Sequence, residues 1–301
     1  MRVTNKMLSR TFLSNLNKNL NAMKKTQEQL SSFKKVSRPS DDPIAVTQIL
    51  GMKTTLAEQA QHMQNMEDGI GWLDATDSAL NNAGEVLKRA YDLTVQAANG
   101  TNPEESLNAI AKEIEQLSDE LRQIANTSYA GRYIFGGTYT GKIPFEVDNG
   151  QVIYKGNDNP LSWEIGAGVT MDINLTGYDV FKVTQDSTTG EWKSEMFSVL
   201  DELKETLKNG GDLEPLIDKV NAQLDHILDQ RAIVGAKTRR LEMSLSRAEE
   251  VNLGLTELTS KLEDVDVAET AMYYAMQRAA YEAALMTGAQ ILQPTLLNFL
   301  R

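Results

Sequence analysis

Two long proline-free windows with heptad spacing constrain this chain more than any other feature. Residues 44–102 and 216–293 contain no proline, and in each window apolar side chains recur at alternating steps of three and four residues. A narrow stripe of this kind is typical of helices that pack as coiled coils. The first stripe contains Ile49, Met52, Leu56, Met63, Met66, Ile70, Leu73, Leu80, Leu87 and Tyr91, and the second contains Ile217, Val220, Leu224, Ile227, Val234, Leu241, Leu245, Ala248, Leu255 and Leu262. We therefore predict two long helices that pack as an antiparallel bundle.

The middle of the chain predicts β-structure. Twelve of the 20 glycines lie between Gly131 and Gly211. Asn149-Gly150 separates the apolar runs 145–147 and 152–154, which is a signal for a hairpin. Residues 161–165 and 169–175 show partial alternation of apolar and polar side chains. The predicted fold class is thus mainly α, with a small β insert between the long helices that projects from the helical rod.

The two ends of the chain predict a further pair of helices. Near the N-terminus, Leu13, Leu16, Leu20, Met23 and Leu30 keep heptad steps. Near the C-terminus, steps of three or four residues join Ala268, Met272, Ala275, Ala279, Ala283, Met286, Ala289, Leu292, Leu296 and Phe299. Alanine favours helix but buries little area, so such a stripe suits dense packing among many helices better than a core of its own. We interpret these residues as an assembly interface.

The resulting organisation has three nested parts. Residues 1–43 with 264–301 form a terminal-helix assembly core, residues 44–130 with 196–263 form a coiled-coil shaft, and residues 131–195 form a β-rich, solvent-facing insert. The first and second helices are joined by a structural turn that comprises Arg38, Pro39, Ser40, Asp41, Asp42 and Pro43. Because prolines flank the two aspartates, a turn and helix cap is a better interpretation of them than acid–base catalysis.

Little in the sequence points to chemistry. Cysteine is absent and there are two histidines, His62 and His226, which leaves no thiolate or multi-histidine metal site. No nucleophile, base and orienting group occur in a recognisable pattern. We therefore predict no catalytic, cofactor or metal site, and a protein that is not an enzyme.

The charge is unevenly distributed. The chain has a formal net charge of −12, yet residues 1–39 contain nine basic side chains and one acidic side chain. Such a segment could be a basic arm for nucleic acid or membrane, or a helix that meets an acidic partner. We favour the second interpretation because apolar residues alternate with the charges at helical spacing. No apolar stretch resembles a secretory signal or a membrane span, so composition alone indicates a cytoplasmic protein.

Several motifs together resemble the bacterial flagellin family. Ser37-Arg-Pro-Ser-Asp-Asp-Pro-Ile-Ala45 is similar to the turn after the first helix of that family, and Val234-Gly-Ala-Lys-Thr-Arg-Arg-Leu-Glu242 is similar to its returning helix. Glu263-Asp-Val-Asp-Val-Ala-Glu269 and Gln277-Arg-Ala-Ala-Tyr-Glu-Ala-Ala-Leu285 resemble its terminal helix. Three further segments fit the hook–filament junction subgroup better than filament flagellins. They are Met1-Arg-Val-Thr-Asn-Lys-Met-Leu8, Arg132-Tyr-Ile-Phe-Gly-Gly137 and Ile291-Leu-Gln-Pro-Thr-Leu-Leu-Asn-Phe-Leu300.

The resemblance implies a structural role and replaces the cytoplasmic prediction. The subunit would leave through the flagellar type III export channel and join hook to filament outside the cell, assembling through its terminal helices. The implied partners are copies of itself, the first hook-associated protein, flagellin and a cytoplasmic export chaperone, with no nucleic acid, membrane or cofactor. A filament-forming flagellin is the alternative.

Overall fold

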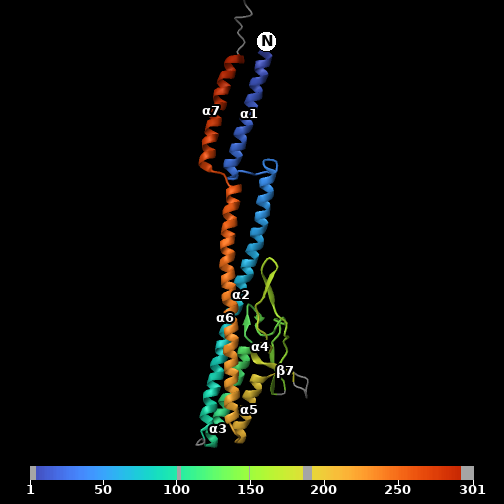
Figure 1. Cartoon of the computed structure of the whole chain (residues 1–301), viewed down its shortest axis with the longest axis vertical. Coiled ribbons are helices and arrows are strands. Elements are labelled where there is room, and N and C mark those ends of the chain that lie inside the picture. Colours follow the sequence, from blue (N-terminus) through green and yellow to red (C-terminus); the bar gives the residue numbers. More distant parts are fainter. Residues whose placement is uncertain (1–4, 100–102, 149, 186–191, 293–301) are drawn as a thin grey trace, which may run out of the picture. The chain divides into compact units, whose positions relative to one another are not determined.

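The computed structural model describes residues 5–99, 103–148, 150–185 and 192–292 (Figure 1). The chain divides into two compact units, Met1–Glu58 with Val251–Arg301 and Gln59–Glu250. Each is described separately, although helices α2 and α6 contribute to both. The boundaries of the three nested parts predicted from the sequence remain a prediction.

Helices dominate the described residues. They are α1 (Asn5–Ser32), α2 (Pro43–Ala98), α3 (Glu104–Ala125), α4 (Gly177–Phe181), α5 (Glu195–Asn209), α6 (Glu214–Glu263) and α7 (Val267–Leu292). Together with the strands of the central region, they confirm the predicted fold class. No helix in the described ranges is both long and apolar enough to cross a membrane.

The strands are short and all pair antiparallel. They are β1 (Ser128–Tyr129), β2 (Arg132–Tyr133), β3 (Phe145–Asp148), β4 (Gln151–Tyr154), β5 (Ser162–Gly166), β6 (Val169–Asp172), β7 (Val183–Gln185) and β8 (Trp192–Ser194). Strands β3, β4, β8 and β7 form one sheet in that order, and β1–β2 and β5–β6 form two separate pairs. The predicted hairpin is confirmed, because Phe145 pairs with Tyr154 and Asp148 with Gln151. Gly150 takes the left-handed conformation there, with φ of 81°, while Asn149 lies outside the described residues.

The long helices of the unit Gln59–Glu250 pack as the heptad pattern predicts. In both helices a buried side chain recurs every seven residues: Met66, Leu73, Leu80, Leu87 and Thr94 in α2, and Val220, Ile227, Val234, Leu241 and Ala248 in α6. A Cβ on Gly69 would approach Leu241 and one on Gly84 would approach Ile227, so the two helices run antiparallel. Arg231 of α6 adds a hydrogen-bonded ion pair to Asp77 of α2, with Nε 2.9 Å from Oδ1.

Helices α3 and α5 complete the helical part of this unit. Pro103 precedes α3, whose first turn carries Glu104 and Glu105, and acidic side chains favour a helix N-terminus. Helix α3 packs against α5, and both bury an apolar stripe. The Ser194 hydroxyl caps α5, and Gly210 ends it in the left-handed conformation.

The β insert has an aromatic core. Phe135, Phe145, Phe181 and Phe197 are buried, with centroid distances of 4.9 to 6.0 Å between contacting rings. Among them the Tyr154 hydroxyl lies 2.9 Å from the carbonyl oxygen of Phe135 and accepts a hydrogen bond from the Gly177 N–H. Burial raises the pKa of Tyr154 well above its usual value, so this hydroxyl stays protonated at any pH of interest.

Polar contacts attach the insert, which the sequence predicted to project from the helical rod, to α2 and α6. Asn65 of α2 donates to the Glu164 carbonyl oxygen at 2.8 Å. From α6, His226 Nε2 lies 2.7 Å from the Asp179 carbonyl oxygen, and Lys237 donates to the Asn174 carbonyl oxygen at 3.2 Å. Burial lowers the pKa of Lys237.

We expect Leu241→Ala to destabilise the unit Gln59–Glu250 by about 3 to 5 kcal/mol, because it leaves a cavity in the seam between α2 and α6. Urea denaturation would measure the change. Leu228→Ala is the matched control on the same helix, since Leu228 is half exposed, and it should cost no more than about 0.5 kcal/mol. Equal losses in both variants would contradict the antiparallel seam.

We also expect Tyr154→Phe to destabilise the insert by about 0.5 to 1.5 kcal/mol, because the hydrogen bonds of the hydroxyl are lost while the ring remains and the Gly177 N–H still donates to the Phe135 carbonyl oxygen at 3.0 Å. Near-ultraviolet circular dichroism during urea denaturation would report the loss. Tyr139→Phe, at an exposed position of the same insert, is the control and should leave the midpoint unchanged.

Candidate assembly surface

Helices α1 and α7 form an antiparallel pair within the unit Met1–Glu58 with Val251–Arg301 (Figure 1). The Thr26 hydroxyl donates to Gln277 Oε1 at 2.7 Å, and the Phe12 ring covers Gly288 so closely that a Cβ there would lie 2.1 Å from Cζ. Partly or fully buried positions recur with heptad spacing on both helices. They are Phe12, Leu16, Asn19, Met23, Thr26 and Leu30 on α1, and Thr270, Tyr274, Gln277, Tyr281, Ala284 and Gly288 on α7.

The predicted stripe on α7 lies on a different face from this seam. Ala268, Met272, Ala275, Ala279, Ala283 and Met286 are all exposed. They are offset by two residues from the buried positions, which corresponds to a rotation of about 200° around the helix. The predicted residues therefore point away from α1. The side chain of Leu292, and Leu296 and Phe299, lie outside the described residues.

On α1 the predicted stripe is divided between two faces. Leu16, Met23 and Leu30 are half-buried and belong to the seam with α7. Leu13 and Leu20 are exposed, with 50% and 42% of their surface accessible. The structure thus brings three of the five predicted α1 residues onto α7 and leaves the other two on the outer face.

Helix α7 exposes apolar side chains on much of its circumference, interrupted by the exposed ion pair of Arg278 and Glu282. Besides the seam, more than half of the surface of Met272, Met276 and Met286 is accessible, and Val267, Tyr273 and Leu285 are also exposed. Exposed apolar side chains gathered on a helix normally mark a face that contacts a partner. Within the described residues, α1 covers one side of α7 and the outer side has no partner.

The predicted turn lies between α1 and α2. Asp42 Oδ1 accepts hydrogen bonds from the Ile44 and Ala45 amides, both at 3.0 Å, and so caps α2. Asp41 Oδ2 accepts from the Arg38 amide at 3.1 Å, which closes the turn. Pro43 is the first residue of α2, where its missing N–H costs nothing. Pro39 and Ser40 are exposed beside them.

One carboxylate in this unit is held by two lysines. Glu263, the last residue of α6, has a side chain that is only 10% exposed. Lys34 Nζ lies 2.5 Å from Oε1, and Lys53 Nζ of α2 lies 2.6 Å from Oε2. These two cations hold the pKa of Glu263 below its usual value, and Glu263 in turn raises the pKa of Lys34. Sequence reasoning missed this cluster, because residues 34, 53 and 263 share no local pattern.

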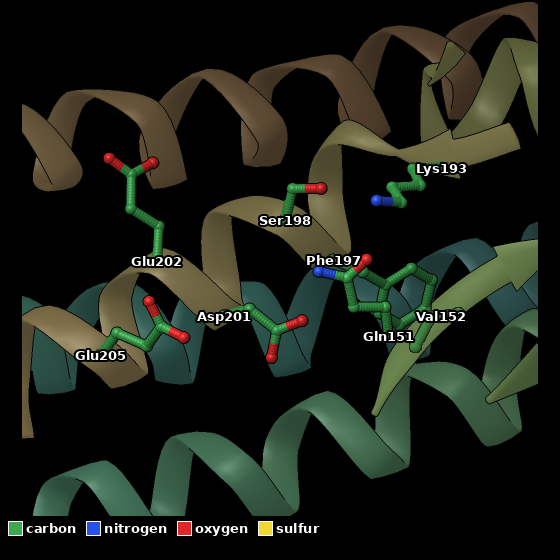
Figure 2. A pocket seen from close by; sticks show the side chains of 8 residues that line it. All are labelled: Gln151, Val152, Lys193, Phe197, Ser198, Asp201, Glu202 and Glu205. Atoms are coloured by element: carbon green, nitrogen blue, oxygen red, sulfur yellow. The ribbon is translucent and has the colours of Figure 1, made fainter. Parts of the chain in front are cut away.

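The pocket shown in Figure 2 lies between α5 and the β3–β4–β8–β7 sheet, and has a volume of about 230 Å³. Asp201, Glu202 and Glu205 of α5 line one side, and Lys193 of β8 lies on the other. Two of the carboxylates already have partners, since Asp201 accepts from Lys204 and Glu202 from Lys219. In the described ranges, no group of three His, Cys, Asp or Glu side chains is placed to hold a metal ion.

Comparisons with known proteins agree with the helical architecture. Residues 3–140 match the family described as "Bacterial flagellin N-terminal helical region". The chain is 28% identical to "Flagellar hook-associated protein 3" of Escherichia coli (strain K12), over 94% of this chain and 95% of that protein. It is 27% identical to "Flagellin" of Bacillus subtilis (strain 168), over 89% of each chain.

A solved structure of a flagellar protein also resembles this chain. The crystal structure of Bacillus cereus FlgL is 28% identical in sequence and superposes with a TM-score of 0.58, covering 70% of this chain and 99% of that one. The resemblance inferred from the sequence motifs is confirmed: residues 3–140 are similar to the N-terminal helical region of bacterial flagellins, and the similarity to flagellar hook-associated protein 3 extends over almost the entire length of this chain.

Proposed function

We propose that this protein is a structural subunit of the bacterial flagellum that joins the hook to the filament. It assembles through its terminal helices after export through the flagellar type III channel. The observation that carries the proposal is the apolar outer face of α7, which α1 leaves uncovered. The similarity to flagellar hook-associated protein 3 supports a role of this face in flagellar assembly.

The composition of this face favours contact with other helices. Ala268, Ala275, Ala279 and Ala283 are small and let a second backbone approach closely, while Met272 and Met286 are flexible enough to fill irregular gaps. An exposed apolar surface of this extent is unfavourable in water and marks an interaction site. Burial in an assembly would remove this cost.

The partners follow from this position in the flagellum. Copies of the same chain would pack side by side, with the first hook-associated protein on the hook side and flagellin on the filament side. Before export, a cytoplasmic chaperone would cover the apolar terminal helix. The subunit then acts outside the cell at the hook–filament junction, as a structural component and not as an enzyme.

Charging the outer face of α7 tests the role of that face. We expect Met272→Lys combined with Met286→Lys to abolish incorporation into flagella, because each burial of a lysine costs several kcal/mol. The free subunit should keep its circular dichroism spectrum and denaturation midpoint, since both residues are exposed in it. Immunoblots of purified hook–basal bodies would measure incorporation.

Val147→Lys is the matched control for this experiment. Val147 is about as exposed as Met272 but lies on β3 of the insert, which we propose to face solvent. This variant should be incorporated like the parent protein. Normal incorporation of the doubly charged α7 variant would overturn the proposed assembly surface.

Deleting the gene separates the proposal from the flagellin alternative. A strain without a junction subunit should build hooks, carry no filaments and release flagellin into the medium. A strain without its filament protein should keep the junction and release no flagellin. Immunoblots of hook–basal bodies and of culture medium distinguish the two, and normal filaments would contradict both.

A further inference from the structure

The connection between the helix pair α1–α7 and the neighbouring helix ends is a compact structure of its own. The Lys35 amide donates to the Glu263 carbonyl oxygen at 2.7 Å, and the Val265 amide donates to the Phe33 carbonyl oxygen at 3.1 Å. Lys34 and Asp264 form an isolated antiparallel bridge between these bonds. The segment that leaves α1 and the segment that leaves α6 are therefore joined by backbone hydrogen bonds.

This backbone bridge includes a strained residue. Phe33 has a φ of 56° and is mostly exposed. The left-handed conformation is unfavourable for a residue with a side chain of this size, and it persists only where surrounding contacts impose it. The Phe33 carbonyl oxygen accepts the hydrogen bond from Val265, and the next residue, Lys34, belongs to both the bridge and the ion cluster of Glu263.

The ion cluster ties together three segments of the chain. Glu263 comes from the end of α6, Lys53 from α2, and Lys34 from the segment that follows α1. The carboxylate is largely withdrawn from water, and its charge is balanced by two ammonium groups at hydrogen-bond distance. Glu263 is the buried member, whereas the side chains of Lys34 and Lys53 are each 46% exposed. Neutralising Glu263 therefore removes the charge that holds both lysines at this point, and should cost more than the loss of a fully exposed pair.

We propose that Glu263, Lys34 and Lys53 form a latch that holds the α1–α7 pair in one arrangement on the adjoining ends of α2 and α6, and that incorporation into the flagellum requires this latch to be closed. The second part of the proposal rests on the proposed function. Preorganisation is the physical reason, because a subunit whose terminal pair is already fixed loses less freedom when it joins an assembly.

The first test measures the latch in the purified full-length chain. Glu263→Gln keeps the size of the side chain and removes its charge. We expect hydrogen exchange of the Val265 and Lys35 amides to become at least about tenfold faster. Exchange at Val234 and Leu241, in the seam of the other unit, should not change.

Glu257→Gln is the matched control. Glu257 also lies on α6 and pairs with Lys261 at 2.8 Å, but both side chains are about two-thirds exposed. An exposed pair four residues apart contributes little, so exchange at Val265 should change by less than about twofold. Equal effects of Glu257→Gln and Glu263→Gln would overturn the latch.

Exchanging charges between two positions shows whether the cluster depends on pairing opposite charges or on the particular native side chains. Combining Glu263→Lys with Lys53→Glu keeps the total charge of the three positions and restores an opposite-charge pair between positions 53 and 263. We expect this double variant to recover slow exchange at Val265, whereas Glu263→Lys alone should not. Fast exchange in both would overturn the electrostatic basis of the latch.

The second test measures incorporation in cells. The proposal expects Glu263→Gln to reduce the amount of subunit in hook–basal bodies at least about tenfold, and the double variant with exchanged charges to restore it. Fast amide exchange together with normal incorporation would overturn the functional part of the latch and leave the junction role intact. Absence of the parent protein from hook–basal bodies would instead overturn the proposed function, while the exchange measurements would still decide the latch.

Discussion

The burial of one side chain every seven residues along α2 and α6 is the constraint on which the rest of the structure depends. Because the two helices are antiparallel, Leu241 meets α2 near Gly69 while Ile227 meets it near Gly84. This pairing fixes the register of the two longest helices in the unit. The β insert and the pair α3–α5 then attach to a frame whose axial positions are already set.

The heptad stripes made this frame predictable, since periodic apolar residues report helix burial directly. The hairpin between β3 and β4 was predictable for a similar reason, because the Asn-Gly signal depends on local backbone geometry. The attachment of the insert to the helices could not be predicted from the sequence. It uses Asn65, His226 and Lys237, single polar residues that bond to backbone atoms far away in the sequence, and such contacts leave no periodic signal.

The terminal helices show a different limit. Counting apolar residues on α7 identifies Ala268, Met272 and their neighbours, yet the seam with α1 contains Thr270, Tyr274 and Gln277 instead. Because α7 carries apolar residues both in the seam and on its outer face, hydrophobicity does not distinguish the face that packs within the subunit from the face that remains free. The small and hydroxyl-bearing residues are better indicators here, because the close approach at Gly288 and the bond from Thr26 to Gln277 require them.

The contact between Phe12 and Gly288 also has a consequence for how α1 and α7 slide against each other. Moving α7 by one turn would place Ala284 beneath the ring, and since a Cβ built at Gly288 would lie 2.1 Å from Cζ, the Phe12 ring would have to move to accept that methyl group. The ring and the glycine act as a stop against axial slippage. The spacing between Leu13 and Leu20 on one helix and Met272 and Met286 on the other is then constant. The pair therefore presents exposed apolar side chains at the same spacing to every neighbouring subunit.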